Sequence, residues 1–215
     1  YENLDEQVRG LDRISEQAHD IISSPTTRKA FDLSLEKTSE STRFGRHEFG
    51  QSLLLASRLI EAGVHFVTVR LRPAEFDFDT HLDNFSKLSA LLPPFDKGLA
   101  SLIDRLKERG LFRSTAIMVA GEFGRTPKIN AQGGRDHWAR AMFALMAGGD
   151  VEGGQVIGET DDRAGAPIGK GYSPDDLAAS FFQNIGINSK HEFQTNIGRP
   201  INLVRDGKPI SQLFS

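Results

Sequence analysis

The sequence has no cysteine among its 215 residues. Disulfides, thiolate metal ligands and cysteine nucleophiles are therefore excluded, and any metal or catalytic site must use other side chains. No apolar run approaches the roughly 18 residues of a membrane-spanning helix, and no secretory signal is visible. The sequence also lacks a basic excess. Its net charge of −3 argues against a general nucleic-acid binder, which neutralises phosphates with lysine and arginine.

Several catalytic motifs are also absent. The chain has no Walker phosphate-binding loop, no GxSxG nucleophile elbow and no HExxH zinc motif. The remaining composition, 38% hydrophobic and 26% charged, suits a globular protein with one sizeable core. We expect a single domain over residues 1–215, with 1–43 as a helical N-terminal segment. Because the chain begins at Tyr1 within polar helical sequence, we also expect a processed chain or a fragment.

Apolar residues recur at helical spacing in several segments. A serine cap followed by proline marks two helix starts, at Ser24-Pro25 and Ser173-Pro174. Pro93-Pro94 should kink or divide the longest helix. The predicted helices cover residues 4–22, 25–37, 47–62, 82–109 and 173–185, with a polar linker at 36–42.

Short apolar runs bounded by glycine or proline predict strands. They cover residues 64–71, 115–120, 142–146 and 155–160. The order strand, long helix, strand is typical of a βαβ unit, which has parallel strands. The sequence therefore predicts an α/β fold with a mostly parallel sheet flanked by helices. Since parallel strands end at one edge, the loops 73–81 and 121–137 should lie together.

Those two loops contain the candidate metal ligands. Asp79 and His81 lie in the first loop, and Asp136 and His137 lie in the second, which is rich in glycine. Carboxylate and imidazole groups bind Zn²⁺ or Mn²⁺ well. The alternative for the first loop is a solvated turn that caps the next helix. Asp136 could bind a metal itself or orient His137.

The second loop also contains charged residues of other kinds. Glu122 follows a predicted strand, where it could be catalytic or simply satisfied by backbone amides or Arg125. Arg125, Lys128 and Arg135 give the loop positive charge, which suits an anionic ligand such as phosphate or sulfate. The alternative is that these cations form salt bridges with Glu122 and Asp136.

Several segments of the sequence resemble those of a known family. They are "DTHLDNFSKL", "GEFGRTPKIN", "GRDHW", "GGQVIGETD" and "GRPINLVRDGKPISQLF". In this order they resemble the domain of unknown function 1501 family, over about residues 44–215. That family is bacterial, abundant in planctomycetes, and placed in the alkaline phosphatase and sulfatase superfamily.

The resemblance implies an alkaline-phosphatase-like fold, of which this chain would be the C-terminal part. It implies one or two divalent ions (Zn²⁺, Mn²⁺, Ca²⁺ or Mg²⁺), with Asp79 and His81 on one of them and His137 as a later ligand. Glu122 stands where the superfamily usually has an Asp-His pair. The nucleophile would lie upstream of Tyr1, and an extracytoplasmic location is expected.

Two functions follow from this resemblance and from the residues. The first is metal-dependent hydrolysis of a small anionic sulfate or phosphate ester, in which Arg125 clamps the ester oxygens and Glu122 binds metal or acts as a base. The second is a non-catalytic protein that retains the fold and binds an anion or a partner through Arg125 and Arg135.

Overall fold

The structure is a computed structural model that describes residues 15, 16, 19, 23–70, 77–169, 171–195 and 197–214. Apart from three positions, the helix predicted over residues 4–22 lies outside the described residues. The chain divides into two compact units. Unit 1 contains Tyr1–Phe78 and Ala90–Arg105, and unit 2 contains Asp79–Ser89 and Leu106–Ser215.

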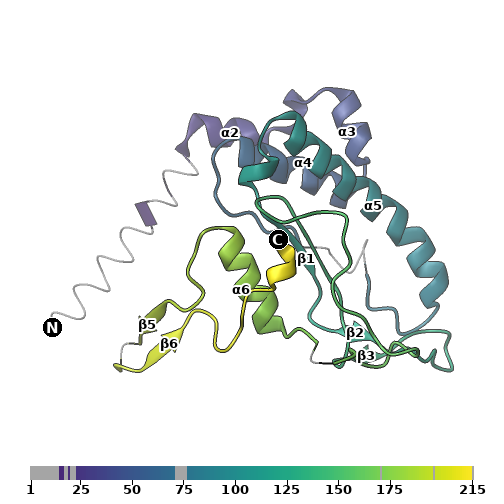
Figure 1. The fold of residues 1–215 in the computed structure, drawn as a ribbon. Coiled ribbons are helices and arrows are strands. Elements are labelled where there is room, and N and C mark those ends of the chain that lie inside the picture. The colour runs from purple at the N-terminus through teal and green to yellow at the C-terminus, as the bar shows by residue number, and fades with distance from the viewer. Residues whose placement is uncertain are drawn as a thin grey trace. The chain divides into compact units, whose positions relative to one another are not determined.

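Unit 1 is built from helices (Figure 1). Phe44 and Leu54 are fully buried in its core. The Ser24 side chain accepts a hydrogen bond from the backbone of Thr27 and caps the first of these helices, as the sequence predicts. The elements are α2 (Pro25–Phe31), η1 (Leu33–Leu35), α3 (Thr38–Phe44), α4 (Glu48–Glu61) and residues 90–105 of α5 (Asn84–Glu108).

Two helix boundaries in unit 1 differ from the prediction. The helix expected over residues 25–37 ends at Phe31, because Asp32 adopts extended backbone and its carboxylate caps the short helix η1. The expected polar linker is largely helical and forms α3. Its polar composition is that of a solvated helix face, and only Phe44 of this helix is buried.

The helix α5 passes through Pro93 and Pro94 without a break. Proline removes a backbone hydrogen bond at each position, so packing must offset the loss. Directly after the prolines, Phe95 stacks on Phe49 of α4 with ring centroids 5.4 Å apart. This contact anchors α5 immediately beyond the prolines and explains why the helix continues. Within the described residues, no helix combines the length and apolarity that a membrane span requires.

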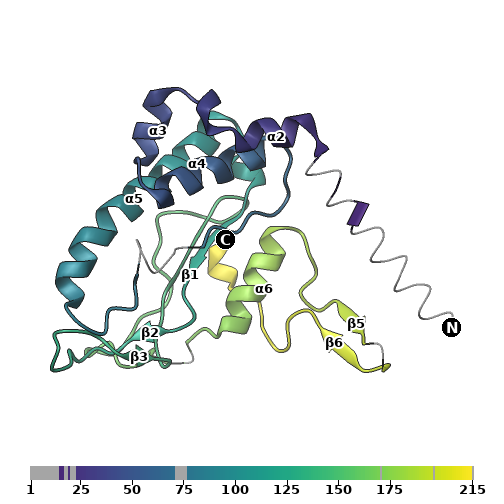
Figure 2. The ribbon, with the colours of Figure 1, turned by 180° about the vertical axis from the view of Figure 1, so that it is seen from behind.

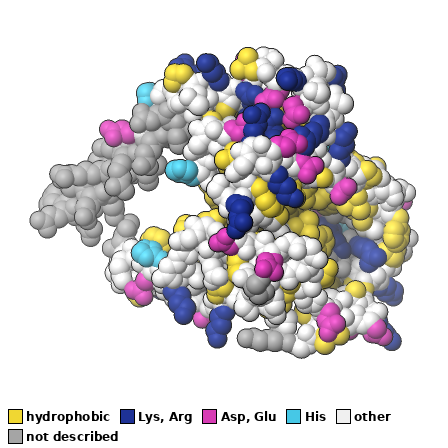
Figure 3. Space-filling view, turned by 45° about the horizontal axis from the view of Figure 1, so that its top comes forward, with side chains coloured by type: hydrophobic (Ala, Val, Ile, Leu, Met, Phe, Trp, Pro, Cys, Tyr) yellow, Lys and Arg dark blue, Asp and Glu magenta, His cyan; other side chains and the backbone are white. Residues whose placement is uncertain are grey.

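A cluster of charged side chains surrounds one buried arginine in unit 1. The Arg105 side chain is 2% exposed and donates to Glu61 at 2.8 Å and to Glu36 at 2.9 Å. It also pairs with Glu40 at 3.2 Å, and Arg58 forms a second ion pair with Glu36. We call these five residues the buried charge cluster. Further Lys, Arg, Asp and Glu side chains intermingle on the surface (Figure 3).

Unit 2 contains all the β-strands of the described residues, in three two-stranded ladders (Figures 1 and 2). All three ladders are antiparallel: β1 with β4, β2 with β3, and β5 with β6. The strands are β1 (Ile117–Ala120), β2 (Gly124–Arg125), β3 (His137–Trp138), β4 (Ala144–Ala147), β5 (Glu192–Gln194) and β6 (Pro200–Asn202). The unit also contains η2 (Phe112–Ser114), α6 (Pro174–Asn184) and η3 (Ser211–Leu213).

The predicted parallel sheet is wrong, and with it the alkaline-phosphatase-like fold. The strand β1 pairs with β4 in opposite direction, with Met118 facing Met146. Residues 64–70, expected as the first parallel strand, belong to no ladder among the described residues. Residues 155–160 form only an isolated bridge, from Thr160 to Pro167. The apolar runs therefore predicted extended segments but not their partners or directions.

Candidate metal centre

Two loops of unit 2 are joined by backbone hydrogen bonds. The amide of Arg135 donates to the carbonyl of Thr80 at 2.9 Å, and the amide of Asn84 donates to the carbonyl of Gly133 at 3.0 Å. The approach is close enough to require glycine at position 134. A Cβ atom there would lie 1.9 Å from the carbonyl oxygen of His81. This junction places residues 79–81 beside residues 133–137.

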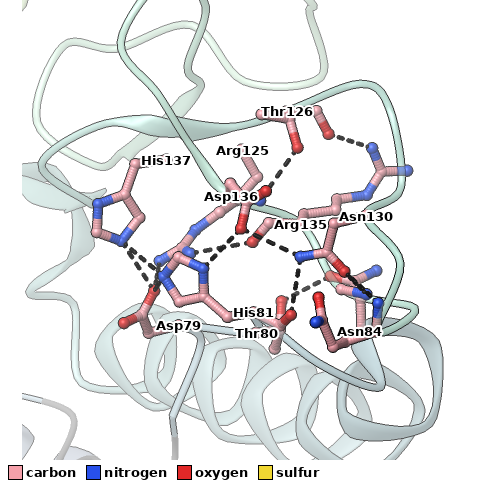
Figure 4. Close-up of polar contacts among 12 residues, drawn as sticks. Asp79, Thr80, His81, Asn84, Arg125, Thr126, Asn130, Arg135, Asp136 and His137 are labelled. Carbon is pink, nitrogen blue, oxygen red and sulfur yellow. Dashed lines mark hydrogen bonds and ion pairs between the residues drawn. The ribbon is translucent and has the colours of Figure 1, made fainter.

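Asn130 fixes the shape of the second loop. Its side-chain oxygen accepts from the backbone amides of Gln132 and Gly134, at 3.0 and 2.9 Å. Its amide nitrogen donates to the carbonyl of His81 at 2.9 Å and to the Asp136 carboxylate at 3.1 Å. One side chain therefore holds the turn, the backbone of the first loop and an acidic side chain of the second (Figure 4).

The short ladder of β2 and β3 aims two side chains at the first loop. Arg125 and His137 lie directly opposite each other on adjacent strands, so their side chains project from the same face. The Phe123 ring packs against the His137 imidazole, with centroids 4.3 Å apart. Both Arg125 and His137 reach Asp79 (Figure 4).

Three potential metal-ligating atoms converge at this point. Asp79 Oδ1 lies 3.0 Å from His81 Nε2 and 3.0 Å from His137 Nε2. The two Nε2 atoms lie 3.1 Å apart. The three side chains are 44–51% exposed, so the site is open to solvent. We call Asp79, His81 and His137 the ligand triangle, and it is the group of described residues best placed to hold a metal ion.

The dimensions of the ligand triangle fit a divalent cation. Ligands at about 2.0–2.1 Å from Zn²⁺ stand about 2.9–3.4 Å apart in octahedral and tetrahedral arrangements. The sides of 3.0–3.1 Å fall in that range. Two imidazoles and one carboxylate are also the donor set of many catalytic zinc and iron sites, which leave further positions open.

Asp136 touches the outer nitrogen of His81. Its Oδ1 lies 2.9 Å from His81 Nδ1. The hydrogen bonds from His81 and Asn130 hold the pKa of the Asp136 carboxyl below its usual value. In the neutral tautomer with its proton on Nδ1, from which the Asp136 carboxylate can accept a hydrogen bond, His81 Nε2 is free to bind a cation beside Asp79.

Arg125 is the cation nearest to the ligand triangle. Its Nη2 forms an ion pair with Asp79 Oδ1, the same oxygen that faces both histidines. Hydrogen bonds from His137 and then from Arg125 lower the pKa of Asp79 against the opposing effect of desolvation. These contacts therefore favour the ionised form of Asp79. An ionised carboxylate is the form that binds metal.

The other residues predicted for the site lie in different settings. Arg135 is committed to backbone, because its Nη1 donates to the carbonyls of Thr126 at 2.6 Å and Pro127 at 2.7 Å. Lys128 is exposed, and its ammonium forms no ion pair with another described residue. Glu122 is exposed and its carboxylate has no hydrogen-bond partner in the described part of the chain. The expected salt bridges of the loop cations with Glu122 and Asp136 are not formed in this part.

The sequence interpretation missed the residues that hold the two loops together. They are Thr80, Asn84, Thr126, Asn130 and Gly134. The pair Gly133-Gly134 ahead of the candidate ligands was the available signal, since adjacent glycines mark tight turns and close backbone approach. Asn130, three residues earlier, is a residue type that hydrogen-bonds nearby backbone in turns. Thr80, 1% exposed, gave no such signal.

Comparison with known proteins identifies the family of the chain. The family described as "Protein of unknown function (DUF1501)" matches residues 2–214, and the chain belongs to it. Neither the curated proteins nor the solved structures include one that matches the chain.

Proposed function

We propose that this protein binds one divalent cation in the ligand triangle and uses it to hydrolyse a sulfate or phosphate ester. The observation that carries the proposal is the convergence of Asp79 Oδ1, His81 Nε2 and His137 Nε2, with sides of 3.0–3.1 Å. Three ligands that leave positions open are typical of catalytic rather than structural metal sites. The solvent exposure of the triangle gives a small ester direct access.

The surrounding residues have distinct tasks in this proposal. When bound, a divalent cation supplies Lewis-acid polarisation and a water of lowered pKa. Asp136 holds His81 in the orientation that directs Nε2 at the site. Arg125 offers guanidinium donors to the oxygens of an anionic ester. Glu122, two residues past β1 and exposed, is retained as a candidate base.

The motif resemblance supports the same chemistry. The resemblance implies that Asp and His side chains at loop ends bind a metal ion, as in sulfatases and phosphatases. We take the proposed reaction, hydrolysis of a sulfate or phosphate ester, from that implication. We also propose an extracytoplasmic location, for which the resemblance is the only support.

A non-catalytic binding role is the second candidate. It is favoured by the hydroxyl groups next to the site, which are both committed to hydrogen bonds. Thr80 donates to Asn84 at 2.6 Å, and Thr126 donates to the carbonyl of Lys128 at 2.9 Å. In this role the protein would bind a cation and an anion without turning over an ester.

The proposal is tested by metal binding to the full chain. We expect about one Zn²⁺ or Mn²⁺ per chain by calorimetric titration and by elemental analysis. His81→Ala should abolish this binding, and Asp136→Asn should weaken it by about 10–100-fold. His191→Ala is the matched control, because His191 is an exposed histidine of unit 2 that contacts Phe193, and it should bind like the wild type.

Activity separates the two candidate functions. Metal-dependent hydrolysis of an aryl sulfate or aryl phosphate, lost in His81→Ala, supports the hydrolase. Cation binding without hydrolysis of either ester supports the binding role. A wild-type chain that takes up no Zn²⁺ or Mn²⁺ refutes the metal site and both forms of the proposal that use it.

A further inference from the structure

Arg125 and a bound cation would need the same carboxylate oxygen. Asp79 Oδ1 contacts His81 Nε2 and His137 Nε2, and it also contacts Arg125 Nη2. A cation held by the ligand triangle would lie about 2 Å from this oxygen. The guanidinium would then lie beside a cation with twice its positive charge. The two cations would compete for the negative charge of the Asp79 carboxylate.

The remaining contacts of Arg125 leave it able to move. Its Nη1 donates to the carbonyl of Arg135 at 3.4 Å, which is long for a hydrogen bond, and its guanidinium carbon lies 6.0 Å from the centroid of the Phe123 ring. Its side chain is 23% exposed. Arg135 differs in this respect, since it is fixed to two carbonyls at 2.6 and 2.7 Å. Arg125 is thus the loop cation that can exchange partners, and it lies next to the proposed cation site through its contact with Asp79.

We propose that Arg125 exchanges Asp79 for an oxyanion when a cation binds, so that cation binding and anion binding reinforce each other. Without an anion, Arg125 competes with the cation for Asp79 and weakens cation binding. With a sulfate or phosphate group beside the cation, the displaced guanidinium gains a bidentate partner. The coupling is reciprocal, so the cation also raises the affinity for the anion. This inference rests on the proposed cation site.

The two tasks of Arg125 give a test with effects of opposite sign. Mn²⁺ binding to the full chain is measured by calorimetry with and without millimolar inorganic sulfate. In the wild type, sulfate should tighten Mn²⁺ binding by about fivefold or more. In Arg125→Gln without sulfate, Mn²⁺ should bind about fivefold tighter than to the wild type, because the competitor is gone. The sulfate effect in this variant should fall below about twofold.

Two further variants make the test specific. Lys190→Gln removes an exposed cation elsewhere in unit 2 that has no ion pair in the described part of the chain, and it should leave both Mn²⁺ affinity and the sulfate effect unchanged. Arg125→Lys keeps the charge but loses the bidentate fork, so it should retain only part of the sulfate effect. Circular dichroism confirms that each variant is folded.

The outcomes separate this inference from the proposed function. Tighter Mn²⁺ binding by Arg125→Gln, together with loss of the sulfate effect, supports the exchange. Mn²⁺ binding that is equal or weaker in Arg125→Gln refutes it while leaving the cation site intact, as does a sulfate effect that survives the substitution. No Mn²⁺ binding by the wild type refutes the cation site itself.

Discussion

The two units each contain a cluster of opposite charges, but the clusters differ in burial. In unit 1, Arg105 is 2% exposed and contacts three carboxylates, one from each of Glu36, Glu40 and Glu61. In unit 2, the ligand triangle and Asp136 are 44–53% exposed. In the first cluster, each of the three carboxylates forms a direct ion pair with the buried Arg105. The second is open to solvent, and in it the imidazoles of His81 and His137 both lie against the Asp79 carboxylate.

We interpret this difference in burial as one between charges that serve folding and charges that serve the proposed cation binding. Burying a charge is costly unless it is paired, so the native fold of unit 1 depends on keeping Arg105 and its partners together. Exposed ion pairs contribute little to stability. The exposed ion pairs of Asp79, His81 and His137 are therefore expected to contribute little to folding, which agrees with the proposed role of the ligand triangle in binding a cation.

The largest expected effect comes from breaking the buried charge cluster. Arg105→Ala leaves the carboxylates of Glu36 and Glu61 without their buried partner. We expect it to lower the free energy of unfolding by about 3–5 kcal/mol. The measurement is urea denaturation followed by circular dichroism.

Arg43→Ala is the control for that experiment. Arg43 pairs with Glu40 and Asp104 at 3.7 Å each, and its side chain is 27% exposed. Its loss should cost at most about 1 kcal/mol. Equal effects of the two substitutions would show that burial does not distinguish the clusters.

A smaller effect is expected from acid. Hydrogen bonds from Arg105, and then from Arg58, hold the pKa of Glu36 below its ordinary value of 4.5, against desolvation. A lowered carboxyl pKa means that the stabilisation is present above pH 4.5 and is lost as pH falls through the folded value. Unfolding measured between pH 6 and about pH 3 should show this loss.

Glu36→Gln isolates the contribution of this carboxylate. The variant should be less stable than the wild type at neutral pH, and its stability should fall less steeply on acidification. Asp79 and Asp136 also have lowered pKa values, but both are half exposed and remain in the variant, so they contribute equally to both proteins. Parallel curves for variant and wild type would contradict the assignment.

The sequence predicted the helices better than the strands, for a physical reason. The periodic apolar face of residues 47–62 and the Ser173 cap encode local structure, and the helices α4 and α6 follow them closely. A strand needs a hydrogen-bonded partner strand, and the local sequence does not identify that partner. Residues 64–70 are rich in the β-branched residues of a strand, yet they join no β-ladder among the described residues.

The structure brings Asp79, His81 and His137 together by a route that the sequence did not predict. Parallel strand ends were expected to bring Asp79 and His81 to His137. The two loops instead meet through backbone hydrogen bonds around Gly133 and Gly134, including an isolated bridge from Leu82 to Gly133. Residue types with metal-binding chemistry could be read from the sequence. The backbone contacts that join them depend on tertiary packing and could not.

The smallest expected effect on the free energy of unfolding is that of removing a side chain of the ligand triangle. This experiment is also the most direct test of the difference between the two clusters. In metal-free buffer, His81→Ala should change the free energy of unfolding by no more than about 0.5 kcal/mol, because this half-exposed imidazole serves no core. A cation at 100 times its dissociation constant should then stabilise the wild type by about 2.7 kcal/mol and leave the variant unchanged.

Urea denaturation of both proteins in EDTA and in Mn²⁺ makes that measurement. If His81→Ala in EDTA costs as much as Arg105→Ala, the triangle is a structural element like the buried charge cluster. If the wild type alone gains stability from Mn²⁺, the exposed cluster stabilises the protein only through its ligand. That conditional stability is what separates a binding site from a set of ion pairs.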